Sequence, residues 1–149
     1  MTDADFHQAI RRIRWVHWYH YPVQGLLMGA AVLVTSGRAA VGQTVEPQLA
    51  TWPALLLLGV LVPVVSICLY MVYKYMRPNL RHPSEVNLRT YLGRVFLRNS
   101  LLCMAALPLL ASYAITHKPF DLLASAGVLL ALSWRLVPTA KTYQRWLIS

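Results

Sequence analysis

Acidic residues are scarce in this sequence of 149 residues, which contains five Asp and Glu against 14 Lys and Arg. None of the five acids lies in the middle of a long apolar segment, since Asp121 stands at the end of one. Proton-coupled transporters and enzymes that hydrolyse bonds inside a membrane generally need an embedded acid or base. We therefore expect the protein not to be an enzyme.

A disulfide framework and a nucleotide-binding loop are also lacking. The two cysteines, Cys68 and Cys103, lie inside apolar segments and do not have the spacing of a disulfide-stabilised domain. No G-x-x-x-x-G-K-[ST] sequence is present to bind a phosphate. No small-residue cleavage site follows the first apolar run, so we do not expect a cleaved signal peptide.

Long apolar segments are what the sequence does contain. Hydrophobic residues make up 57% of the chain and charged residues 13%. The clearest segment, Trp52 to Tyr73, runs for 22 residues without a charge. At ~1.5 Å per residue a helix of this length spans roughly 33 Å, which matches the hydrocarbon thickness of a bilayer. We expect four membrane-spanning helices, at about residues 20–37, 52–74, 97–116 and 120–138.

Basic amphipathic helices are expected immediately before the first and third spans. Over residues 4–18, apolar side chains such as Ile10 and Ile13 recur at steps of three and four, while the arginines fall largely off that stripe. We expect this helix to lie on the membrane surface before the chain turns inward. A second interfacial helix, with Leu88 on its apolar stripe, is predicted over residues 85–97 and runs into the third span.

Basic residues gather on one side of the predicted bundle. With four spans, one side carries twelve Lys and Arg, and the other carries only Arg38 and Lys118. The positive-inside rule places the basic side, and with it both termini and the loop at residues 75–96, in the cytoplasm. The sequence therefore predicts an all-α, polytopic protein of the inner cell membrane, with one four-span domain over residues 1–149.

The net charge of +9 favours anionic lipid headgroups as partners over nucleic acid, because the basic residues flank the apolar segments. A cytoplasmic rim of Arg98, Arg135, His17, His20 and Gln24 is predicted to hold such a headgroup. Membrane lipids are accordingly the expected partners, and no nucleic acid is expected.

Small residues form two faces that allow helices to approach closely. Gly25 and Gly29 lie four residues apart in the first span, and Gly127 and Ala131 have the same spacing in the fourth. These faces can pack within the chain, against a second copy, or against a membrane-protein partner. Packing within the chain is the expected use, because a four-span bundle must bury such faces, and association with a second copy or a partner is the alternative.

Histidines mark the entry to the first span. His17 and His20 share one helical face with Gln24, and interfacial histidines of this kind commonly bond to backbone groups, lipid phosphates or Tyr hydroxyls. The run Arg14-Trp15-Val16-His17-Trp18 resembles the R-x-x-H-W entry to the first span of bacterial b-type cytochromes, such as the cytochrome b561-like and the hydrogenase or formate dehydrogenase cytochrome subunits. The resemblance implies haem b on His17 or His20, with His82 as the partner ligand from another element. Spans two to four carry no histidine, which departs from the pattern of those families.

The leading prediction is a non-catalytic integral membrane protein without a cofactor, acting as a small subunit or scaffold of a membrane assembly. One alternative is a b-type haem electron carrier. The other is a transporter of a small solute or lipid, in which Pro63 and Pro108 act as gating kinks. No metal site is predicted, because two histidines without a third ligand fall below the usual ligand count.

Overall fold

The described residues of the computed structural model, 3–39, 47–79 and 81–148, form helices joined by short connections. Side chains are described for residues 5–34, 55–79 and 81–148. The predicted all-α class is therefore confirmed. The elements are α1 (Asp3–Ala39), α2 (Pro47–Tyr75), α3 (Ser84–Cys103), the 3₁₀ turn η1 (Met104–Ala106), α4 (Leu107–Thr116), α5 (Pro119–Arg135) and α6 (Ala140–Ile148).

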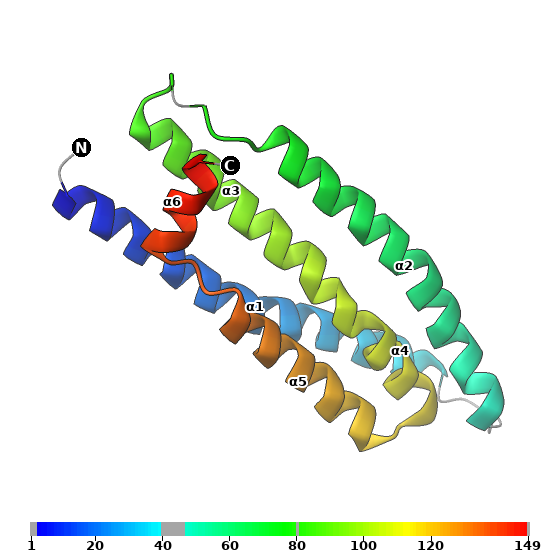
Figure 1. The fold of residues 1–149 in the computed structure, drawn as a ribbon. Coiled ribbons are helices and arrows are strands. Elements are labelled where there is room, and N and C mark those ends of the chain that lie inside the picture. Colours follow the sequence, from blue (N-terminus) through cyan, green and yellow to red (C-terminus); the bar gives the residue numbers. More distant parts are fainter. Residues whose placement is uncertain (1–2, 40–46, 80, 149) are drawn as a thin grey trace.

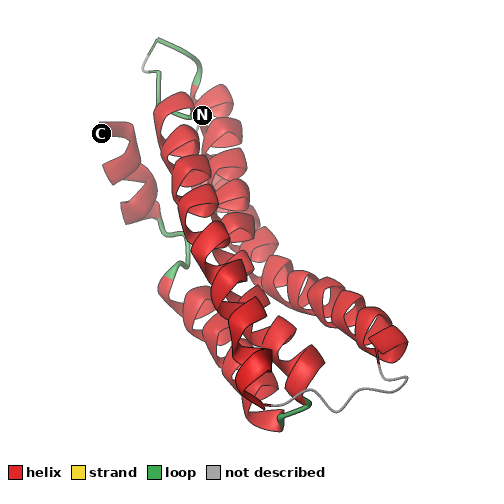
Figure 2. Ribbon diagram, turned by 90° about the vertical axis from the view of Figure 1, so that its right-hand side faces the viewer, coloured by secondary structure: helices red, strands yellow, loops and turns green. Residues whose placement is uncertain are grey.

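The long helices run beside one another and alternate in direction (Figure 1). The start of α1, the α2–α3 connection and α6 gather at one end of the bundle, and the α4–α5 turn lies at the other. The view turned by 90° shows the C-terminal helix at the side of the bundle at the same end as the start of the chain (Figure 2). We call this end the basic end, because most of the Lys and Arg residues lie there.

Two helical stretches of the described residues are long and apolar enough to cross a membrane: Leu55–Tyr75, and Ser84–Thr116, which runs through α3, η1 and α4. The pair α5 and α6 passes the same test only when taken together, and it is bent by 73°. The described part of the chain thus provides two or three candidate spans rather than clearly four. Over its described side chains, α1 does not pass, because His20 and Gln24 interrupt the apolar run of the predicted first span.

Neither basic lead-in is a separate helix: the first continues into the predicted first span without the expected turn inward, and the second runs into the third span as predicted. α1 is one helix of 37 residues that continues through Pro22. Proline removes one helical hydrogen bond, and the two residues before it, His20 and Tyr21, are buried against the bundle. Likewise α3 begins at Ser84 and runs without interruption past residue 97 into the predicted third span.

The amphipathic stripes of the lead-ins face protein. Ile10 and Ile13 of α1 form one buried cluster with residues of α3 and α6. Trp146 of α6 also donates a hydrogen bond from Nε1 to the carbonyl oxygen of Met76, 3.2 Å away, just beyond the end of α2. We call this cluster the clasp, and its buried members are Ile10, Ile13, Leu88, Tyr91, Val95, Tyr143 and Trp146. The clasp joins the ends of four helices, α1, α2, α3 and α6.

Proline also explains the break between α3 and α4. Pro108 has no N–H to donate to the carbonyl of Met104, and that carbonyl accepts a hydrogen bond from the N–H of Leu107 instead. The shorter bond tightens the chain into the 3₁₀ turn η1. Of the two prolines predicted to act as kinks, Pro108 follows a break between helices, whereas Pro63 lies inside α2, which stays one helix.

The turn at the opposite end is held by Asp121. Its Oδ2 accepts hydrogen bonds from Ser112 Oγ at 2.7 Å and from Thr116 Oγ1 at 3.2 Å. His117 ends α4 in a left-handed conformation, with a φ of 51°. Asp121, at the start of the predicted fourth span, therefore links α5 to α4.

Candidate functional site

A buried polar network crosses the bundle at His17. The His17 side chain is 1% exposed. Its Nε2 lies 2.9 Å from the carbonyl oxygen of Ser133 on α5, and its Nδ1 lies 2.8 Å from Nδ2 of Asn99 on α3. Because a carbonyl oxygen only accepts, Nε2 carries the proton and Nδ1 accepts from the Asn99 amide. His17 is therefore a neutral imidazole that joins three helices.

The electrostatic surroundings favour the same neutral state of His17. Burial lowers the pKa of the imidazole below its ordinary value of 6.5. The hydrogen bond to the Ser133 carbonyl raises this pKa, and the nearby charge of Arg98 lowers it further. The net direction is downward, so protonation of His17 opposes the folded arrangement.

Arg98 faces the end of α5. Its Nη2 donates to the carbonyl oxygen of Leu136 at 3.2 Å and to Asn99 Oδ1 at 3.3 Å. A guanidinium at this position complements the negative end of the α5 dipole. Within the described part of the chain, Arg98 Nε and the Tyr21 hydroxyl are buried polar atoms without a hydrogen-bond partner. The interior at this point therefore contains two polar atoms that no hydrogen bond satisfies.

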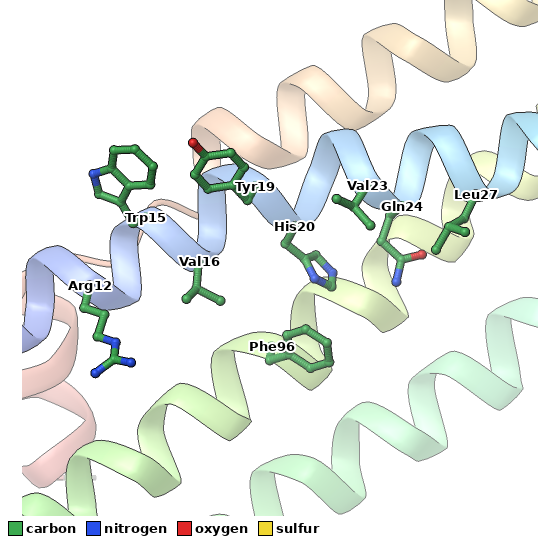
Figure 3. A pocket seen from close by; sticks show the side chains of 9 residues that line it. All are labelled: Arg12, Trp15, Val16, Tyr19, His20, Val23, Gln24, Leu27 and Phe96. Atoms are coloured by element: carbon green, nitrogen blue, oxygen red, sulfur yellow. The ribbon is translucent and has the colours of Figure 1, made fainter.

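His20 connects this network to a hollow on the surface of the bundle. Its Nε2 lies 3.3 Å from Ser100 Oγ, and its ring packs edge-on against Phe96, with the ring centroids 4.7 Å apart. Figure 3 shows His20 between α1 and α3, above Phe96. We call the hollow, of about 470 Å³, the His20 hollow; it is lined by Arg12, Trp15, Val16, Tyr19, His20, Val23, Gln24, Leu27 and Phe96.

Two further hollows continue the first along the same helices. The Arg89 hollow, about 430 Å³, shares Arg12 and Val16 with the His20 hollow and adds Arg89 of α3. The Cys68 hollow, about 460 Å³, shares Gln24 and reaches α2. Each of these two hollows adjoins the His20 hollow, with which it shares lining residues, and we call the three together the α1–α3 groove.

The predicted haem ligands are not arranged as a haem site. A haem iron needs an unshared lone pair from its histidine, and both ring nitrogens of His17 are already hydrogen-bonded. His82 lies exposed in the connection between α2 and α3, where its backbone N–H donates to Asn79. Within the described residues, no group of three or more His, Cys, Asp and Glu side chains could hold a metal ion. The residues present therefore do not fit the haem that the entry motif implies.

The residues of the predicted anion-binding rim lie in three different environments. Gln24 lines the α1–α3 groove, where the His20 and Cys68 hollows meet. Arg135 is exposed at the end of α5, and Arg98 is directed towards Leu136. His17 and His20 do lie close to Arg98 and its neighbours on α3, but His17 is buried inside the bundle.

Sequence reasoning missed the polar partners on the other helices. Asn99 and Ser133 complete the network around His17, and Ser100 bonds His20. A signal was present, because these polar residues lie inside predicted spans where unpartnered polar groups are costly. Arg12 and Arg89 were also missed as a pair, since they line one hollow from two different helices.

Comparisons of the chain with protein-family models, with curated proteins and with solved structures found no match.

Proposed function

We propose that the protein is a non-catalytic integral membrane protein that crosses the membrane four times, with both termini in the cytoplasm. In this proposal it acts as a small subunit or scaffold of a membrane assembly. The alternating directions of α1, α2, α3–α4 and α5 support four crossings (Figure 1). The positions of the basic residues support the orientation, because they gather at the end where both chain termini lie.

The observation that carries the proposal is the exposed apolar surface of α2. Over the described residues Leu55–Tyr75, no side chain is buried, and Leu56 is 65% exposed. α2 packs against α3 and α4 through one side only and leaves the rest of its apolar surface uncovered. A helix that is apolar all round is stable where lipid or a partner helix surrounds it.

The small residues of α1 and α5 supply a second argument for a partner. An added Cβ at Gly25 would lie 3.5 Å from Leu129 Cδ1, so this glycine already serves close packing of α1 on α5. At Gly29 and Gly127, no described atom lies within 4 Å of an added Cβ. These two positions remain open to a close approach from a neighbouring helix.

The test is purification of the tagged full-length protein from its native membrane in a mild detergent. We expect a membrane-protein partner in fixed stoichiometry, or a homo-oligomer, by size-exclusion chromatography coupled to light scattering. A Gly29→Leu variant is expected to weaken the association, and a Gly29→Ala variant, which adds less bulk at the same position, is expected to weaken it less. A monomer without a partner, in detergent and by crosslinking in the native membrane, would contradict the scaffold.

The same preparation separates the proposal from its alternatives. A Soret band that is lost in a His20→Ala variant would establish the haem carrier instead. Uptake or efflux that follows the amount of protein in reconstituted vesicles would establish a transporter.

A further inference from the structure

We propose that the α1–α3 groove binds one anionic diacyl phospholipid. Its phosphate would lie between Arg12 and Arg89, and its two acyl chains would follow the His20 hollow and the Cys68 hollow. This inference rests on the proposed membrane location and adds a defined ligand to it.

The charged end of the groove matches an anionic headgroup. Arg12 comes from α1 and Arg89 from α3, both are exposed, and both line the Arg89 hollow. Among the described residues that line the three hollows, none is acidic. Two guanidinium groups from different helices can therefore bind one phosphate without competition from a carboxylate.

The rest of the groove matches acyl chains. Below Arg12 the α1 wall of the His20 hollow is mostly aromatic and aliphatic as far as Leu27, and Phe96 of α3 completes it (Figure 3). The distance from Arg12 to Leu27 along the helix is about 22 Å, more than half of the ~30 Å hydrocarbon core. A chain in this hollow therefore reaches through one leaflet while its phosphate stays at the basic end.

A second apolar hollow adjoins the first. Gln24 lines both the His20 hollow and the Cys68 hollow, and the latter continues between α2 and α3 with apolar side chains such as Met71, Val72 and Leu97. The two hollows have similar volumes, about 470 and 460 Å³. With the phosphate at Arg12 and Arg89, both acyl chains would enter the His20 hollow, and one of them would continue past Gln24 into the Cys68 hollow.

The experiment is native mass spectrometry of the full-length protein released from nanodiscs made of phosphatidylglycerol or of phosphatidylcholine with the same acyl chains. We expect one retained phosphatidylglycerol per protein and at least tenfold less retained phosphatidylcholine. An Arg12→Gln, Arg89→Gln double variant is expected to lose this preference. An Arg11→Gln, Arg14→Gln double variant removes the same charge from a different pocket, and it is expected to keep the lipid.

A second variant tests the apolar part of the groove. Val16 lines both the Arg89 and the His20 hollows and is 37% exposed, so Val16→Trp should fill the groove without disturbing the core. We expect it to release phosphatidylglycerol while its thermal unfolding stays close to that of the parent protein. A Leu27→Trp variant at the far end of the His20 hollow gives a second blocking position if Val16→Trp unfolds.

Three results would overturn the lipid site. The first is equal lipid loss in the two double variants, which would reduce the effect to general surface charge. The second is retention of phosphatidylglycerol by folded Val16→Trp and Leu27→Trp. The third is loss of a protein partner, with no change in bound lipid, when the groove is blocked.

Glycerol 3-phosphate, added at the same concentration as the lipid, separates recognition of the headgroup alone from recognition of the whole lipid. It should not displace the lipid. Lipid retention does not depend on the stoichiometric partner, so the two proposals can fail separately.

Discussion

The clasp and α2 use apolar residues in opposite ways. In the clasp, residues from strongly charged segments bury aromatic and branched side chains against one another. In α2, a segment with hardly a charge keeps its leucines and valines exposed. The clasp therefore packs as the core of a water-soluble bundle does, whereas α2 presents its apolar side chains outward. An exposed apolar face of this kind is the arrangement that a lipid solvent favours.

The largest expected effect comes from breaking the clasp. Trp146 is 5% exposed, and Trp146→Ala removes its packing and the hydrogen bond to the Met76 carbonyl. We expect the free energy of unfolding in detergent to fall by about 3–5 kcal/mol, as for other large-to-small core changes. Trp134→Ala is the matched control, because Trp134 is 79% exposed on α5. Equal losses for the two variants would show that the clasp is not a folded core.

A smaller effect is expected in the polar network. Asn99→Leu removes the donor to His17 Nδ1 and the acceptor for Arg98. We expect a loss of about 1–3 kcal/mol in the free energy of unfolding, because buried polar groups lose their partners. Gln144→Leu, at an exposed position of α6, should be close to neutral. A double-mutant cycle with His17→Leu should show non-additive losses in the free energy of unfolding. Strictly additive losses would show that Asn99 and His17 have no interaction free energy and would contradict the network.

The pH dependence follows from the lowered pKa of His17. The unfolded chain binds a proton at His17 near pH 6.5, whereas the folded protein resists protonation to a lower pH. This contribution to stability is therefore present above about pH 6.5 and is lost as the pH falls below it. The groups that face the His17 imidazole are His20, Tyr21, Asn99 and Arg98. None of these four residues is substituted in this test. Thermal unfolding between pH 5 and pH 8 should show a weaker decline at low pH in His17→Gln than in the parent protein, and identical profiles would contradict this assignment.

The smallest effect on stability is expected on the outer face of α2. Leu56→Ala truncates a side chain that contacts little protein, so the free energy of unfolding of the isolated protein should change by less than about 0.5 kcal/mol. The measurement is the same detergent unfolding curve. A loss as large as that of Trp146→Ala would show that α2 is packed inside an assembly even in detergent, and it would break the contrast between the two regions.

The uncharged length of α2 and the periodicity of the stripes of α1 and α3 were sufficient to find these features, because both signals are local. Periodicity could not show what covers a stripe. Ile10 and Ile13 read as a membrane-surface face, whereas α3 and α6 cover them. The local sequence did not predict that α1 continues through Pro22, where the structure has one uninterrupted helix.

The candidate site shows the same division between local and long-range information. A hydrogen bond from interfacial His17 to a backbone group was expected, and the Ser133 carbonyl provides it. The partner itself is 116 positions away in the sequence, so spacing could not identify it. Arg98 read as a ligand for lipid headgroups because it lies near a predicted membrane end, and the structure directs it to the end of α5.

Cysteine labelling in intact cells tests the membrane arrangement most directly. In a Cys68→Ser, Cys103→Ser background, single cysteines are introduced as Gln8→Cys on α1, Gln144→Cys on α6 and Lys118→Cys in the α4–α5 turn. A maleimide that does not cross membranes should label the Lys118→Cys variant in intact cells, and it should label the other two only after permeabilisation. Labelling of the Gln8→Cys variant in intact cells, or recovery of the protein in the soluble fraction without detergent, would contradict the account.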